Sequence, residues 1–185
     1  VEVNVDLAEN KEVEYAVADM RGKYRIASEN KNKIPLVKEI LSHHQDDLCL
    51  IIGQYISQLE ELAKEIHAPL ITGKSSTKIR EALYDDFRMG KVKVIIVSKI
   101  ANFAIDLPDA SVAIQISGSY GSRQEEAQRL GRILRPKEKN SYFYTIITKD
   151  TVERDFGEKR QKFLAEQGYD YTVLNSANIE EYLSN

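Results

Sequence analysis

The stretch Leu48-Cys49-Leu50-Ile51-Ile52-Gly53 is an unbroken apolar run that ends at a glycine. A run of this length is typical of a β-strand that is buried on both faces, as strands are in a parallel sheet. The residues that follow return to helical spacing, with apolar side chains at Ile56, Leu59, Leu62, Ala63 and Ile66. This succession of a strand and a helix predicts an α/β fold.

Strand and helix patterns alternate along most of the remaining chain, with short connections between them. Further strands are expected at residues 70–72, 92–97, 112–116, 142–147 and 171–174. Helices are expected around residues 36–41, from residue 79 to a stop near Gly90, from Ser122 onward, along residues 152–164 and at residues 179–183. Such alternation favours a parallel sheet with helices on both faces, whose ligands bind at the carboxyl ends of the strands.

The first 30 residues differ in composition from the rest of the chain. Residues 1–29 carry seven acidic and four basic side chains, and few large aliphatic ones. We therefore expect residues 1–30 to form an acidic N-terminal extension that lies outside the main core, strand-like at its start and helical near residues 10–26. Residues 29–32 are expected to form a loop, and residues 31–185 a single domain.

The composition excludes several classes of protein. The 185 residues are 42% hydrophobic and 30% charged with a net charge of −3, so the chain is not a basic coat for nucleic acid. One cysteine excludes an internal disulfide, and with only three histidines beside it no metal site is expected. Cys49 itself, inside an apolar run, is expected to be a core residue.

The sequence also indicates where the protein is located. No apolar run approaches the roughly 20 residues that span a bilayer, and no secretory signal pattern is present. We therefore expect a cytoplasmic protein without a membrane partner. The chain begins with Val1 rather than methionine, which suggests a piece of something longer.

The stretch Gln128-Arg129-Leu130-Gly131-Arg132-Ile133-Leu134-Arg135 carries the strongest signal for chemistry. At about 100° per residue on a helix, Gln128, Arg132 and Arg135 form one polar stripe beside a narrow apolar stripe. Gly131 lies between the two stripes and suggests the close approach of another group. Paired guanidinium groups suit a phosphate, because arginine offers a fork of donors and stays charged. A solvated basic face with a packing glycine is the alternative that the spacing leaves open.

A second candidate site follows the short strand at residues 70–72, where a connection with glycine and hydroxyl side chains begins a helix. Backbone N–H groups, hydroxyls and a lysine there could hold a DNA phosphate, and the end of the next strand could hold a neighbouring one. A tyrosine on a glycine-flanked loop could stack on a base. Helix capping by residues 75–77 and a structural tyrosine are the alternatives. The candidate DNA contacts are Gly73, Lys74, Ser76, Thr77, Ser98, Lys99 and Tyr120.

The sequence Gly73-Lys74-Ser75 resembles the end of a phosphate-binding P-loop. That motif needs a glycine five positions before Gly73, and Ala68 stands there. The chain also contains no Asp-Glu box of the Walker B type after a suitable strand. We therefore expect no self-contained nucleotide site, since the parts that hold Mg²⁺ and the phosphates are missing.

Three stretches resemble motifs of superfamily-2 helicases, in the order found in the second RecA-like lobe of those proteins. Residues 50–55 resemble motif IV, residues 97–110 resemble motif V, and residues 128–135 resemble motif VI, whose pattern is QxxGRxxR. At Ala104 the chain departs from the glycine that many superfamily-2 proteins carry in motif V. Because alanine does not readily adopt a positive φ, that loop is expected to differ from the common one.

The closer resemblance is to the XPB branch of these helicases. It rests on residues 115–127, Gln-Ile-Ser-Gly-Ser-Tyr-Gly-Ser-Arg-Gln-Glu-Glu-Ala, which run into the motif VI stretch. It also rests on residues 159–169, Lys-Arg-Gln-Lys-Phe-Leu-Ala-Glu-Gln-Gly-Tyr, a block that superfamily 2 at large does not share. The resemblance covers about residues 33–175 and suits a prokaryotic, for example archaeal, member.

The resemblance implies a RecA-like parallel sheet and the C-terminal motor lobe of an ATP-dependent 3′→5′ DNA helicase or translocase of nucleotide-excision repair or transcription. Arg135 would be the arginine finger and Arg132 a second contact to the γ-phosphate. Gln128 would position the γ-phosphate or the attacking water, and Asp106 would contact the ribose or relay the nucleotide state. ATP with Mg²⁺ would be held mainly by a first lobe of the same protein, so this chain alone is an incomplete active site.

Two other functions remain open at this stage. The chain could be a partner-docking module of a repair complex that recruits, for example, a nuclease through residues 1–30 or the tail after Tyr169. It could also come from an RNA helicase, although those commonly carry histidine where Gln128 stands. A prokaryotic member would lie with the nucleoid, and a eukaryotic one in the nucleus.

Overall fold

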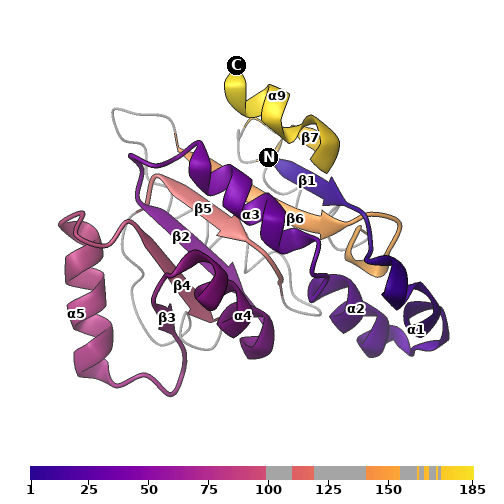
Figure 1. The fold of residues 1–185 in the computed structure, drawn as a ribbon, viewed down its shortest axis with the longest axis horizontal. Coiled ribbons are helices and arrows are strands. Elements are labelled where there is room, and N and C mark those ends of the chain that lie inside the picture. The colour runs from indigo at the N-terminus through magenta and orange to yellow at the C-terminus, as the bar shows by residue number, and fades with distance from the viewer. Residues whose placement is uncertain (99–109, 119–140, 155–161, 163–164, 167–169, 171) are drawn as a thin grey trace.

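The computed structural model describes residues 1–98, 110–118, 141–154, 162, 165–166, 170 and 172–185. Within them, seven strands form one sheet in the order β3-β4-β2-β5-β6-β1-β7 (Figure 1). All neighbouring strands in it are parallel, so the predicted parallel sheet is confirmed. The strands are β1 (Glu2–Val5), β2 (Cys49–Gly53), β3 (Leu70–Ile71), β4 (Val94–Ser98), β5 (Val112–Gln115), β6 (Tyr142–Thr148) and β7 (Val173–Asn175).

The apolar run that begins at Leu48 supplies a strand in the middle of the sheet. β2 lies between β4 and β5, and all five of its residues are buried. Side chains alternate along a strand, so Cys49 faces one core cluster and Leu50 the other. Burial raises the pKa of the Cys49 thiol to about 12. The expectation of a doubly buried strand, with Cys49 in the core, is confirmed.

Helices cover both faces of the sheet. The helices α3 (Lys33–Ser42), α4 (Ile56–Ile66) and α9 (Ile179–Ser184) contribute to the cluster that contains Cys49, and α5 (Thr77–Arg88) contributes to the opposite one. Figure 1 shows α3 and α4 in front of the sheet. After α5, Gly90 has a φ of 76°, a left-handed conformation that glycine adopts without strain, so the expected stop near this residue is confirmed.

Two parts of the first 30 residues, β1 and one face of α2 (Met20–Ser28), are buried, contrary to the expectation. β1 pairs with both β6 and β7, and Val3 and Val5 are buried in the same cluster as α3. The valines at positions 1, 3 and 5 form an alternating strand pattern, which the acidic composition around them obscured. The placement outside the main core is therefore wrong for β1, whereas the helix Glu12–Val17 has no buried residue.

The helix expected near residues 10–26 is divided into two. After a 3₁₀ turn (Glu9–Lys11), α1 (Glu12–Val17) ends, and α2 (Met20–Ser28) begins with Asp19 as its N-cap. The Asp19 carboxylate accepts a hydrogen bond from the N–H of Gly22 at 2.8 Å, which favours a new helix start at this point. Among the described residues, no helix has both the length and the apolar character needed to cross a membrane.

Candidate functional site

The carboxyl ends of the strands lie along one edge of the sheet, because the described strand pairs are all parallel. The register sets Gly53 at the end of β2 opposite Ser98 at the end of β4, and Ile71 of β3 opposite Val97. The structure thus brings the connection after β3 beside Ser98, as the sequence predicts. Ser98 is 1% exposed, whereas Gly73, Lys74, Ser76 and Thr77 are exposed at the surface.

The connection between β3 and α5 is held in shape by its own hydroxyl groups. The Ser75 hydroxyl accepts a hydrogen bond from the N–H of Thr72 at 3.0 Å, and the Ser76 hydroxyl accepts one from the N–H of Ile79 at 3.2 Å. Arg80 donates through Nη2 to the carbonyl of Ser75 at 3.1 Å. Ser76 is therefore the N-cap of α5, and the helix-capping interpretation is confirmed for this residue.

Capping by Ser76 leaves this end of α5 able to bind an anion. In the first helical turn the N–H of Ile79 is bonded to the Ser76 hydroxyl. The partial positive charge of the helix N-terminus favours a negative group there. Lys74 is exposed nearby and forms no ion pair with a described residue. A phosphate contact at this loop stays a prediction from sequence, with an exposed lysine and a helix N-terminus beside each other.

Gly53, at the end of β2, lies where the backbone meets two neighbouring elements. A Cβ atom at this position would approach Leu59 Cδ2 to 2.5 Å and Ile116 Cγ2 to 3.0 Å. It would also lie 3.1 Å from the hydroxyl of Ser117. The glycine is therefore required by close packing between β2, α4 and the segment that follows β5.

We expect Gly53→Ala to lower the free energy of unfolding by about 1–3 kcal/mol, because overpacking a filled core forces neighbours from their positions. Chemical denaturation of the wild type and the variant measures this difference. Leu59→Ala is the test of the cause, since it removes the side-chain atoms nearest to the added methyl group. If the losses of stability caused by Gly53→Ala and Leu59→Ala simply added in the double variant, the contact between the new methyl group and Leu59 would not be the cause.

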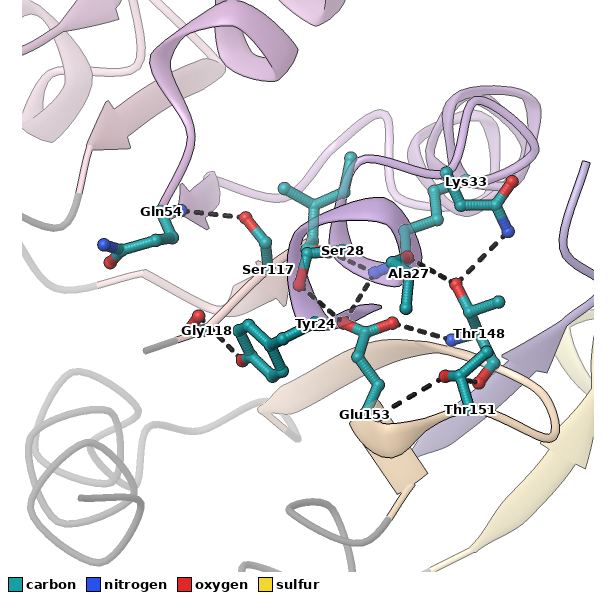
Figure 2. Close-up of polar contacts among 12 residues, drawn as sticks. Tyr24, Ala27, Ser28, Lys33, Gln54, Ser117, Gly118, Thr148, Thr151 and Glu153 are labelled. Carbon is teal, nitrogen blue, oxygen red and sulfur yellow. Dashed lines mark hydrogen bonds and ion pairs between the residues drawn. The ribbon is translucent and has the colours of Figure 1, made fainter. Parts of the chain in front are cut away.

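The segment that leaves β5 is fixed by hydrogen bonds to three consecutive residues (Figure 2). The carbonyl of Ile116 accepts one from Lys33 Nζ at 2.8 Å. The hydroxyl of Ser117 accepts one from the N–H of Gln54 at 2.8 Å, and the carbonyl of Gly118 accepts one from the Tyr24 hydroxyl at 2.8 Å. The three donors come from α3, from the connection after β2 and from α2, so three separate elements converge on one exit.

A buried ion pair lies at the centre of this arrangement. Lys33 Nζ is 2.9 Å from Glu153 Oε2, and the two side chains are 0% and 6% exposed. Glu153 Oε1 accepts a hydrogen bond from the N–H of Thr148, at the end of β6, at 2.9 Å. The hydroxyl of Ser28 lies 3.4 Å from Glu153 Oε2 as a further donor. Each charge is thus paired and hydrogen-bonded, which is the condition for burying it without a large free-energy cost.

The sequence analysis did not identify Lys33 or Glu153 as functional residues. A local signal was present for Lys33, because it lies one and two helical turns before Val37 and Ile40, on the apolar face of α3. A lysine in that stripe needs a buried acceptor, but its partner is 120 positions away in the chain. Spacing alone could not identify Glu153 as that partner.

The other predicted site residues lie outside the described residues. They include both motif VI arginines and the acidic residue of motif V, so their roles stay predictions from sequence. The residues concerned are Lys99, Asp106, Tyr120, Gln128, Arg132 and Arg135.

The chain is similar to XPB proteins along its whole length. A family model described as ERCC3/RAD25/XPB C-terminal helicase matches residues 1–185. The DNA 3′-5′ helicase XPB of Mycobacterium tuberculosis is 49% identical over 181 residues, which cover 97% of this chain and 33% of that protein. The general transcription and DNA repair factor IIH helicase/translocase subunit XPB of Dictyostelium discoideum is 37% identical over 171 residues, covering 88% and 21%. The chain thus spans a third or less of the length of these relatives.

Solved structures with low sequence identity share the fold. The C-terminal domain of the DEAD-box protein Dbp5 has a TM-score of 0.74 at 13% identity, and the match covers 100% of this chain and 93% of that one. The E. coli DEAD-box protein SrmB has a TM-score of 0.60 at 13% identity, covering 94% and 88%. These likenesses confirm the predicted RecA-like fold. With that fold and a family match from the first residue to the last, the chain belongs to the ERCC3/RAD25/XPB C-terminal helicase family.

Proposed function

We propose that this chain is the second motor lobe of an ATP-dependent 3′→5′ DNA helicase or translocase that acts in nucleotide-excision repair or in transcription-linked DNA opening. The observation that carries the proposal is the family match over residues 1–185. The name of the Mycobacterium tuberculosis relative, a DNA 3′-5′ helicase, supports the polarity. The names of the factor IIH relatives support the link to repair and transcription.

In the proposed motor, ATP with Mg²⁺ is held mainly by a first lobe that lies outside this chain. Arg135 acts as the arginine finger, Arg132 as a second contact to the γ-phosphate, and Gln128 positions the γ-phosphate or the attacking water. Asp106 contacts the ribose or relays the nucleotide state. Positive charge directed at the transferring phosphoryl group stabilises the charge of its transition state, which is the main chemical contribution a second lobe can make.

The proposed grip on DNA lies at the carboxyl edge of β3 and β4. The exposed connection of residues 73–77 offers backbone N–H groups at a helix N-terminus and the Lys74 ammonium group. Such contacts fix the position of a backbone without reading its sequence. Ser98 is buried, so its contribution would depend on the backbone at the end of β4. Lys99 and Tyr120 are proposed from sequence to complete the grip.

Lys74→Ala is expected to weaken DNA binding by the full-length protein similarly for all sequences. One lost phosphate contact should reduce the slope of log affinity against log salt by about 1. Fluorescence anisotropy at several salt concentrations measures this slope. Lys64→Ala is the matched control, because Lys64 is also an exposed lysine and lies in the last turn of α4, the end of that helix far from the carboxyl end of β2. An equal loss of affinity in both variants would contradict a specific contact at Lys74.

Strand displacement tests the proposed function as a whole. The full-length protein should release the short strand from a duplex with a 3′ single-stranded tail in the presence of ATP and Mg²⁺. It should release little from the same duplex with a 5′ tail. If displacement is absent on both, a triplex-displacement assay for translocation on duplex DNA becomes decisive. Absence of ATP-dependent movement in both assays would refute the proposal.

A partner-docking role has one structural observation in its favour. Val13, Val17 and Met20, on α1 and α2, are 78%, 80% and 52% exposed, and exposed apolar side chains close together in the chain can mark an interaction site. The partner proposed for such a role is a repair nuclease. The protein would then act on DNA in the nucleoid of a prokaryote or in the nucleus of a eukaryote. Val17→Asp should abolish co-purification of a candidate nuclease with the full-length protein while leaving ATP turnover unchanged. Retention of the nuclease would exclude this surface.

A further inference from the structure

The exit of β5 is the point from which the chain continues toward the predicted catalytic arginines. Ile116, Ser117 and Gly118 are the last described residues before residues 119–140, which carry Gln128, Arg132 and Arg135. All three exit residues are hydrogen-bonded, each to a donor from a different element. Fixing three successive residues from three directions leaves the backbone there little freedom to shift.

Two of the three donors are almost completely buried, and the third, Gln54, is partly buried. Tyr24 is 1% exposed and Lys33 is fully buried. A hydrogen bond in such surroundings does not compete with water, and an acceptor that loses its donor there stays unsatisfied. The connection to the sheet is therefore stiffer than a surface loop contact of the same length.

Glu153 extends this arrangement to the neighbouring strand. It pairs with Lys33 through Oε2 and accepts from the N–H of Thr148, the last residue of β6, through Oε1. Figure 2 shows Glu153 between the side chains of α2 and the end of β6. Glu153 thus binds the end of β6 directly and is connected to the β5 exit through Lys33, which donates to the Ile116 carbonyl.

We propose that Tyr24, Lys33 and Glu153 are positioning residues for the motif VI arginines. They act by fixing the β5 exit, and through it the starting point of the segment that carries Arg132 and Arg135. This inference rests on the proposed function. Catalysis by a charged group is sensitive to its position, and a misplacement of about 1 Å can lower a rate by about 10²-fold. Neither the family match nor the motifs assign such a role to these three residues.

Tyr24→Phe in the full-length protein is the first test, because it removes one hydroxyl and leaves the ring in the core. We expect kcat for ATP hydrolysis to fall by about 10-fold, a smaller loss than the roughly 10²-fold that a 1 Å misplacement can cause. The KM for ATP should change by less than about 2-fold, since the first lobe supplies most of the binding. The matched control is Tyr84→Phe on α5, a tyrosine that is 2% exposed and whose hydroxyl has no hydrogen-bond partner among the described residues. This control should keep the wild-type kcat.

A double variant separates positioning from a general effect on the fold. If Tyr24 acts through Arg135, adding Tyr24→Phe to Arg135→Ala should lower the single-turnover rate by less than about 2-fold, because contributions made through one group are not additive. The thermal unfolding midpoint of each variant is measured alongside. An unchanged kcat in Tyr24→Phe, or an equal loss with and without Arg135, would overturn the inference.

The same experiment distinguishes failure of the inference from failure of the proposed function. If Arg135→Ala lowers turnover and Tyr24→Phe does not, the positioning role is wrong and the motor proposal stands. If Arg135→Ala retains normal turnover, the arginine-finger assignment is wrong and the positioning role is wrong with it. Glu153→Gln provides an independent check, since it keeps an acceptor for Thr148 but removes the charge opposite Lys33. It should lower kcat at least as much as Tyr24→Phe.

Discussion

Replacing Arg135 by alanine in the full-length protein is expected to lower ATP turnover at saturating ATP and DNA by about 10³- to 10⁵-fold, the range attributed to arginine fingers. The guanidinium is predicted to balance the charge that develops on the transferring phosphoryl group, so its loss should affect kcat far more than the KM for ATP. Steady-state phosphate release measures both parameters.

A nearby lysine supplies the control for Arg135. Lys137→Ala removes one positive charge only two positions away. Lys137 belongs to the polar run Lys137-Glu138-Lys139-Asn140, which predicts a solvated turn. Turnover should stay within about 2-fold of the wild type, because exposed charges contribute little. Normal turnover in the Arg135 variant would contradict the finger assignment. Equal losses in both variants would indicate a general charge effect in place of a specific contact.

Lys33→Ala is expected to lower the free energy of unfolding by about 3–5 kcal/mol, because it leaves Glu153 buried without its counter-charge. The pair lies 2.9 Å apart with both side chains almost entirely buried. Urea denaturation of the wild type and the variant measures the difference. A loss of this size is a large fraction of the stability of an ordinary domain, so low expression is an expected accompaniment.

The chain offers a matched control on the same helix. Lys38 pairs with Glu65 at 2.7 Å, but both side chains are about half exposed, at 47% and 48%. Lys38→Ala should change stability little, because water and salt screen such a pair. A double variant, Lys33→Met with Glu153→Leu, should recover part of the loss, since apolar residues of similar volume can replace a buried ion pair. The recovery should be incomplete, because the Ile116 carbonyl and the Thr148 N–H lose their partners. Equal effects of Lys33→Ala and Lys38→Ala would contradict the importance of burial.

Much of the fold could be predicted from the sequence, because the strands are short apolar runs bounded by glycine or polar residues. β2, β4, β5 and β6 each lie within two residues of their expected bounds. β1 was misplaced because Glu2 and Asn4 alternate with its valines, and the acidic composition of the region outweighed the alternation. The break at Asp19 was missed because an N-cap inside a continuous helical pattern has no periodic signal.

The candidate site was predictable only where it depends on strand ends. Parallel strands end at one edge, so the connection after β3 and the end of β4 could be expected to meet, and they do. The Tyr24, Lys33 and Glu153 arrangement could not be predicted, because its members are brought together by pairings between distant parts of the chain. Local spacing carries no information on which carboxylate meets a buried lysine.

ATP hydrolysis by residues 1–185 alone, compared with the full-length protein, tests most directly the claim that this chain is the second lobe of a two-lobe motor. Residues 1–185 alone and the full-length protein are each assayed with saturating ATP, Mg²⁺ and DNA. A second motor lobe that depends on its partner lobe for the nucleotide should give background turnover alone and DNA-stimulated turnover in the full-length protein. Full-length turnover rates from residues 1–185 alone, or no DNA-stimulated turnover from the full-length protein, would contradict the claim.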